Sequence, residues 1–163
     1  MRSFSNLWFW IALAVLWSSA SHWVIGVPFD LIQRAKRSGG QHSEDLDALV
    51  RINVNRLLYI SNTAGLWIVG AAAFFVSGLI VLGFFYRVQF AQALACLVVP
   101  MCLVSALSVR TARKIASGEN TGAALHRRLS RQRKSTQAIG MLAIFFTSMW
   151  GMWQNINVGV LGH

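Results

Sequence analysis

The stretch at residues 63–85 reads TAGLWIVGAAAFFVSGLIVLGFF and contains no charged residue. A helix of about 20 residues crosses about 30 Å of hydrocarbon, so this run is long enough to span a bilayer. Only YRVQ (residues 86–89) separates it from a second apolar run, FAQALACLVVPMCLVSALSV at 90–109. Because so short a connection allows only a tight return, we expect two antiparallel membrane-crossing helices joined as a hairpin.

Two further apolar stretches, at 7–27 and 138–156, lie on either side of this hairpin in the sequence. Both have the length of a spanning helix, and both carry Trp near an end, where indole rings favour the bilayer interface. The chain has 163 residues and is 55% hydrophobic, with a mean hydropathy of +0.51. We therefore predict an all-α membrane protein with a single domain and four transmembrane helices, at about 7–27, 63–85, 90–109 and 138–156.

A polar segment with helical periodicity precedes the second predicted span. From Leu46 to Leu58, leucine and valine recur at steps of three and four residues, which is the spacing of one apolar helix face. Ser43 is a suitable N-cap, and the acidic residues that follow it favour the positive end of a helix. We expect an amphipathic helix at about 44–60 that either lies along the interface and runs into the second predicted span, or packs on neighbouring helices.

Positive charge concentrates in the connections at 28–62 and 110–137, which we predict to be basic loops. Of the 15 Lys and Arg residues, only Arg2 and Arg87 lie outside these connections. With four spans, both connections share one side of the membrane. The positive-inside rule makes that side cytoplasmic, in a multi-pass protein of a bacterial inner membrane with periplasmic termini. Because topology accounts for the net charge of +10, we expect no nucleic acid partner.

The strongest local signal is a dense run of positive charge just before the last predicted span. Its members are Arg127, Arg128, Arg131, Arg133 and Lys134. Cations beside a span anchor the topology and bind anionic lipid headgroups, at roughly 1 kcal/mol per charge near the surface. The same cluster suits the docking of an acidic cytoplasmic protein. Lipid contact and partner contact are both kept as interpretations.

The sequence carries no pattern of catalysis or cofactor binding. Ionisable residues are nearly absent from the apolar stretches, whereas membrane enzymes and proton carriers keep such groups inside the bilayer. Cys96 and Cys102 share one span on different helix faces, so we interpret them as small buried residues rather than a disulfide or cluster ligands. We expect a protein that is not an enzyme, without catalytic, metal-binding or cofactor-binding residues. Pro100 predicts a helix kink, because it removes one backbone hydrogen bond.

Long segments of the chain carry a resemblance to a known family. They are MRSFSNLWFWIALAVLW (1–17), SHWVIGVPFD (21–30), VRINVNRLLYI (50–60), LSVRTARKIA (107–116) and QAIGMLAIFFTSMWGMWQNINVGVLG (137–162). They resemble a small four-span family of alphaproteobacteria of the Rhodobacter group, whose members carry the name component of SufBCD complex. The resemblance implies a link to iron–sulfur cluster assembly, as a membrane tether acting through its basic loop. It assigns no functional residues.

Two hypotheses of function follow from these observations. The first is a non-catalytic integral membrane accessory or tethering protein, whose basic loops meet anionic lipid or an acidic partner. The alternative is a small transporter or a subunit of a redox complex that binds a lipid or quinone. Its site would lie at Pro100 or near the tryptophan-rich end of the last span, Met149–Trp153.

Overall fold

The chain begins with an apolar helix that ends in a tight turn. The computed structural model describes residues 6–118 and 121–160, with side chains as far as residue 157. Helix α1 (Leu7–His22) opens on Asn6, whose side chain accepts a hydrogen bond from the Trp8 amide at 3.1 Å. It is followed by a two-stranded antiparallel hairpin, β1 (Trp23–Val24) and β2 (Val27–Pro28). The first predicted span, 7–27, is therefore too long at its C-terminal end.

The hairpin turn explains where α1 stops. Its two central residues, Ile25 and Gly26, both have positive φ, at 54° and 74°, as a two-residue hairpin turn of the tight type requires. Gly26 also lies close to Asn53, whose side-chain amide donates a hydrogen bond to the Gly26 carbonyl at 3.3 Å. A β-carbon at Gly26 would lie 3.3 Å from the Asn53 side chain, so a larger residue there would meet both the strain of the positive φ and a tight contact with Asn53.

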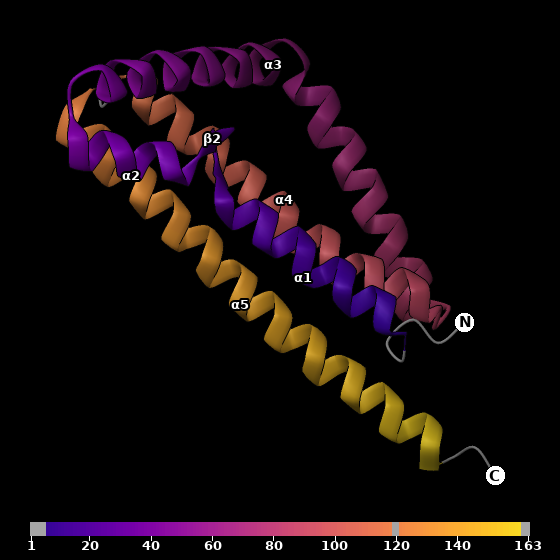
Figure 1. Ribbon diagram of the computed structural model, residues 1–163. Helices are drawn as coiled ribbons and strands as arrows, with labels where there is room; N and C mark the ends of the chain where they lie inside the picture. The colour runs from indigo at the N-terminus through magenta and orange to yellow at the C-terminus, as the bar shows by residue number, and fades with distance from the viewer. Residues whose placement is uncertain (1–5, 119–120, 161–163) are drawn as a thin grey trace.

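Helix α2 (Phe29–Ser38) and helix α3 (Gln41–Ile80) follow, separated by Gly39 and Gly40, which have φ of 57° and 55°. The predicted amphipathic helix at 44–60 and the predicted span at 63–85 are one long helix, drawn in Figure 1 with a bend between two arms. The predicted cap at Ser43 is wrong, because α3 starts after Gly40. A π-helical turn, η1 (Val81–Phe85), ends this helix before the return.

After the turn that follows η1, helix α4 (Gln89–Ala116) runs antiparallel to the apolar arm of α3 and continues through Pro100. Helix α5 (Gly122–Val160) is the last element. Within the described residues, two helical segments are long and apolar enough to cross a membrane, Gln41–Phe85 and Gln89–Ala116. Helix α1 is apolar but has only 16 residues. In α5, hydroxyl groups, Gln154 and Asn155 interrupt the apolar run. The structure confirms the all-helical class. Two of the four predicted spans, 63–85 and 90–109, lie in helices that are long and apolar enough to cross a membrane.

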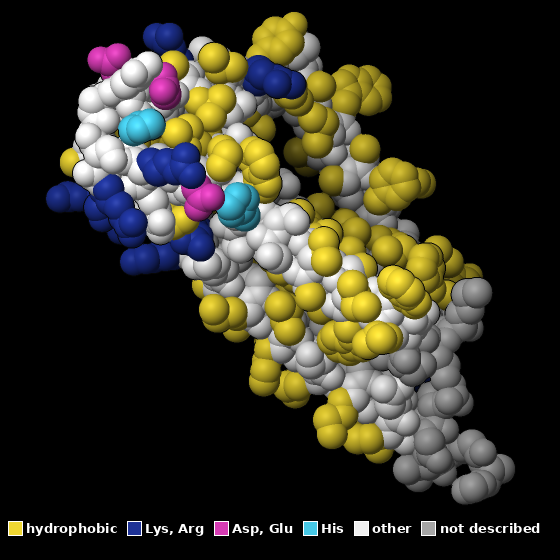
Figure 2. Space-filling model, in the orientation of Figure 1, with side chains coloured by type: hydrophobic (Ala, Val, Ile, Leu, Met, Phe, Trp, Pro, Cys, Tyr) yellow, Lys and Arg dark blue, Asp and Glu magenta, His cyan; other side chains and the backbone are white. Residues whose placement is uncertain are grey.

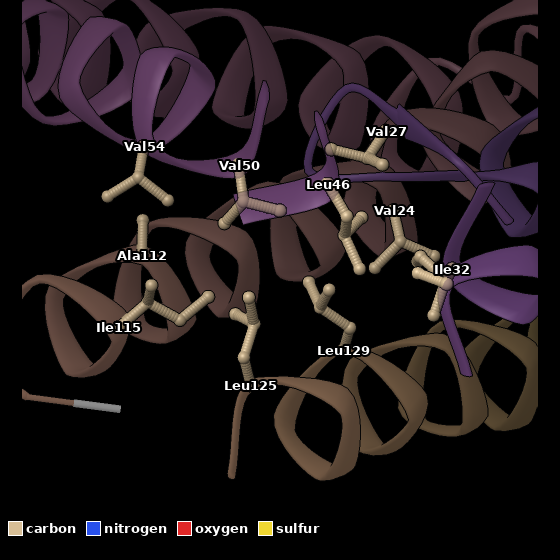
Figure 3. Packing of buried hydrophobic residues seen from close by; sticks show 11 residues of the cluster. Val24, Val27, Ile32, Leu46, Val50, Val54, Ala112, Ile115, Leu125 and Leu129 are labelled. Carbon is tan, nitrogen blue, oxygen red and sulfur yellow. The ribbon is translucent and has the colours of Figure 1, made fainter. Parts of the chain in front are cut away.

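The polar part of the chain folds into a helical unit with its own core, here called the head. Its buried residues come from the hairpin, α2, the first arm of α3, the end of α4 and the start of α5 (Figure 3). They are Val24, Val27, Ile32, Ala35, Leu46, Val50, Val54, Ala112, Ile115, Leu125 and Leu129. Each fully buried aliphatic side chain contributes about 1.5–3 kcal/mol. The connections at 28–62 and 110–137 are therefore largely helical and packed together, rather than loops.

A second, smaller core joins the apolar parts of α1, α4 and α5. Leu13 and Trp17 of α1 pack with Val104 of α4 and Ala143 of α5. The apolar arm of α3 is different, since Leu66 and Trp67 are 86% and 82% exposed. Figure 2 shows hydrophobic side chains over most of the visible face and Lys and Arg gathered mainly at the head. This division matches a body in contact with apolar surroundings and a head in water.

Candidate functional site: a basic groove between α2 and α5

A wide cavity lies on the head, between α2 and the start of α5. It has a volume of about 1270 Å³. Six basic side chains line it, and none of the described lining residues is acidic. They are Lys36, Arg37, Arg127, Arg128, Arg131 and Lys134. We call this cavity the basic groove. Its walls come from segments about 90 positions apart in sequence, which the head core brings together.

Helix α5 supplies one wall because its two faces differ. Arg127, Arg131 and Lys134 recur at steps of four and three residues, so they share one helix face and line the groove. Leu125 and Leu129 lie on the opposite face and are fully buried in the head core. Burial of the apolar face therefore sets the rotation of the helix and turns the cations outward.

Polar contacts with α4 fix the same rotation of α5. Buried Gln132 accepts a hydrogen bond from the Thr111 hydroxyl at 2.7 Å and donates one to the Ser108 hydroxyl at 3.1 Å. Thr136 donates to the Gln132 carbonyl at 3.1 Å. Buried polar groups are costly without such partners, so the network favours this one packing arrangement of the two helices.

Helix α2 supplies the other wall by the same principle. Ile32 and Ala35 face the head core and are buried, while Lys36 and Arg37 lie exposed in the last turn. Cations in the last turn are favoured by the negative end of the helix dipole. In the sequence these two residues contribute only to the charge count that predicts topology. Their charge was visible, but their nearness to α5 depends on long-range packing.

Four of the five residues in the predicted basic cluster line the groove, and the fifth does not. The guanidinium carbon of Arg133 lies 3.6 Å from the ring centroid of Phe29, in a cation–π contact. Its Nε is buried and has no hydrogen-bond partner in the described part of the chain. Arg133 therefore supports the groove by holding Phe29, which is itself a lining residue. Arg133 lies on a different face of α5 from Arg127, Arg131 and Lys134. Its closeness to them in sequence therefore does not place it in the groove.

An acidic and an imidazole side chain lie beside the groove. Burial raises the pKa of Asp47 on α3 above 3.8, and the nearby His126 of α5 opposes this effect. Asp47 Oδ1 and His126 Nδ1 are both buried without a hydrogen-bond partner among the described residues. His126 also lines the groove. The ionised form of Asp47 is thus disfavoured in the folded head.

A second cavity, of about 420 Å³, lies around Pro100 between η1, α4 and α5. Its lining is apolar apart from Cys96 and Thr147, and the Thr147 hydroxyl already donates to the Ala143 carbonyl. Since Pro100 has no N–H, the carbonyl of Cys96 lacks its usual helical partner. The cavity suits an apolar chain. Pro100, where we predicted a kink, is one of its walls, and α4 continues as a helix on both sides of it.

The tryptophan-rich end of α5 has a polar partner that sequence analysis missed. The Trp150 indole N–H donates to Gln92 Oε1 at 3.2 Å, and the Gln154 amide donates to the same atom at 3.1 Å. Buried Gln92 donates in turn to the carbonyl of Gly83 in η1 at 2.7 Å. These groups bind α4, α5 and the π-helical turn together, so their hydrogen bonds serve the fold rather than a ligand.

Among the described residues, no three His, Cys, Asp or Glu side chains gather as metal ligands would. Cys96 and Cys102 are both free thiols. The chain matches no family model, no curated protein and no solved structure with which we compared it. The function must therefore be argued from the geometry, and the family resemblance stays a proposal.

Proposed function

We propose that this protein is a non-catalytic accessory or tethering protein of a bacterial inner membrane. The observation that carries the proposal is the basic groove: Lys36 and Arg37 of α2 converge with the α5 cations on a head attached to apolar helices. Such a head offers a concentrated positive surface that attracts acidic partners or anionic headgroups. The lining of the groove combines cations with apolar side chains, which suits the binding of an anionic partner.

A four-span arrangement fits the packing of the body. In this proposal α4 and the apolar arm of α3 cross the bilayer, and α1 and the second half of α5 cross beside them. Trp17 of α1, Val104 of α4 and Ala143 of α5 share one buried cluster, which supports a common depth. At 1.5 Å per residue, α1 covers about 24 Å, a mismatch that local thinning of the bilayer can absorb.

Charge supports the orientation. Figure 2 shows Lys and Arg side chains gathered mainly at the head. Arg87, in the turn between η1 and α4, is an exception. The positive-inside rule then favours a cytoplasmic head with both termini in the periplasm. The resemblance to the Rhodobacter-group family adds iron–sulfur cluster assembly as the system that such a tether would serve. In that role the protein holds a complex at the membrane without itself ligating a cluster.

Purification from native membranes tests the proposal. The full chain, tagged after His163, is isolated in a mild detergent, and the proteins that accompany it are identified and quantified by mass spectrometry. We expect a partner at near-stoichiometric amount, and iron–sulfur assembly proteins would support the family resemblance. Isolation of the chain alone or as a homo-oligomer would refute the tether. A matched preparation of an unrelated four-span protein with the same tag controls for carry-over.

The cavity around Pro100 favours a second candidate, a small transporter or redox-complex subunit that binds a lipid or quinone. Its volume of about 420 Å³ and apolar lining suit one hydrocarbon or isoprenoid chain. Val99→Trp would fill the cavity from an exposed position, so it disturbs the fold little. An organic extract of purified protein should then contain a lipid or quinone that is lost in Val99→Trp. Equal extracts and a spectrum without a chromophore would count against this candidate.

A further inference from the structure

In the four-span arrangement proposed above, with α5 upright in the bilayer, the basic groove extends beyond the reach of lipid headgroups. The apolar part of α5 begins near Ala138, and the helix runs without interruption from Gly122 through this point. At 1.5 Å per residue, Lys134 stands about 6 Å beyond that boundary and Arg127 about 16 Å beyond it. The headgroup layer is only about 5–7 Å thick on each side. In that arrangement headgroups reach Lys134, while the Arg127 end of the groove extends past them into water.

The shape and lining of the groove favour a peptide. Arg127, Arg131 and Lys134 form a straight row about 10 Å long on α5, with Lys36 and Arg37 on the facing wall. The same three- and four-residue steps place acidic side chains along one face of a partner helix. Phe29, fixed by Arg133, adds an aromatic surface to the floor of the groove. A volume of about 1270 Å³ exceeds what one phosphate group needs.

We propose that the basic groove binds an acidic segment of a cytoplasmic partner protein, with carboxylates along one helix face meeting the row Arg127, Arg131 and Lys134. The inference rests on the proposed tethering function and deepens it by naming the chemistry of the partner. The groove gives the partner a position and a direction: its acidic segment runs from the headgroup level at Lys134 away from the membrane toward Arg127. Long-range attraction to the six cations speeds the encounter, and contacts inside the groove set the register.

The experiment uses the full chain in bilayer discs of phosphatidylcholine, so that no anionic lipid competes. The probe is a fluorescent synthetic peptide whose glutamates recur at three- and four-residue steps, and its matched control carries glutamines instead. Fluorescence anisotropy measures binding to the wild type, to Arg127→Glu/Arg131→Glu and to Arg34→Glu. Arg34 is an exposed cation of α2 outside the groove, so its variant changes charge without changing the lining. Arg127 and Arg131 are both exposed, and Arg127→Gln/Arg131→Gln serves as a milder variant.

We expect the glutamate peptide to bind the wild type, with affinity reduced about tenfold or more in the doubly reversed variant and nearly unchanged in Arg34→Glu. Equal affinity for the wild type and Arg127→Glu/Arg131→Glu would overturn the proposal. So would an equal loss in Arg34→Glu, which would mean general attraction to a positive surface. Tighter, groove-dependent binding of a single-stranded oligonucleotide of the same charge would also overturn it, in favour of a nucleic acid.

The lipid alternative and the tethering function are tested separately. If bound phosphatidylglycerol, quantified after purification, falls in Arg127→Glu/Arg131→Glu while peptide binding does not, the groove is a lipid site and the proposal fails. In native membranes, a partner that co-purifies equally with the wild type and this variant leaves the tether intact but refutes the groove as its docking site. If no partner co-purifies with either protein, the tethering function itself is refuted.

Discussion

Gly140→Ala should loosen the contact between α1 and α5, although alanine is the better helix former. A β-carbon at Gly140 would lie 2.8 Å from Trp17 Cε3 and 3.2 Å from Cδ2, well inside the roughly 3.5–4.0 Å of a favourable carbon contact. Trp17 is only 6% exposed, so its ring has little room to yield. We expect an overpacking cost of about 1–3 kcal/mol. The gain from replacing a helical glycine with alanine is about 0.5–1 kcal/mol.

Gly70→Ala is the matched control, because a β-carbon there meets nothing within 4 Å. Both variants share the helix-propensity gain, so their free energies of unfolding should differ by the overpacking cost alone, about 1–3 kcal/mol. The assay is unfolding in mixed detergent micelles, followed by tryptophan fluorescence. Trp17→Leu makes space at the contact, so Gly140→Ala should cost little in that background. Equal stability of the two alanine variants, or an equal Gly140→Ala cost with and without Trp17, would refute the reasoning.

Three further substitutions test the head core, the hydrogen bond between Trp150 and Gln92, and the raised pKa of Asp47. Leu129→Ala removes a fully buried core side chain and should lower the free energy of unfolding by about 2–5 kcal/mol, whereas Leu142→Ala, at a 58% exposed position, should change it little. Gln92→Leu leaves the Trp150 indole N–H without its partner, so we expect about 1–3 kcal/mol lower stability in denaturant unfolding, with altered tryptophan emission. Asp47 has a raised folded-state pKa, so ionisation removes stability as pH rises above 3.8. Asp47→Asn should therefore raise the melting temperature at pH 7 but give no gain below pH 3.8, and an equal gain at both would contradict this account.

The helical class could be predicted from sequence because it depends on local patterns. The apolar run at 63–85 and the repeat from Leu46 to Leu58 both produce helix in the structure. Their fusion into a single helix was one of two arrangements that the sequence left open, because a polar-to-apolar change can also mark a boundary between two elements. Backbone hydrogen bonds continue across such a change, provided that no proline or strained glycine intervenes. The end of α1 was missed because Ile25 at positive φ has no sequence signal.

The candidate site was half visible in the sequence. The α5 cations stood out as a run, and their helical spacing was available. Lys36 and Arg37 could not be joined to them, because that contact depends on the packing of Ile32, Leu125 and Leu129 in one core. Arg133 does not line the groove but packs on the ring of Phe29, and the position of that ring is set by the fold. The periodicity of a single sequence shows which residues share one face of a helix. It does not show which helix faces pack against each other, because tertiary packing decides that.

The unbroken course of α4 and α5 has a mechanical consequence. Each continues from the apolar body into the head as a helix, without a hinge segment between the two within the described residues (Figure 1). Helices resist bending far more than flexible linkers do, so the head cannot swivel freely above the bilayer. A molecule held on it would keep a fixed height and heading relative to the membrane plane. Conversely, a sideways pull on the head would act as torque on the membrane-side helices.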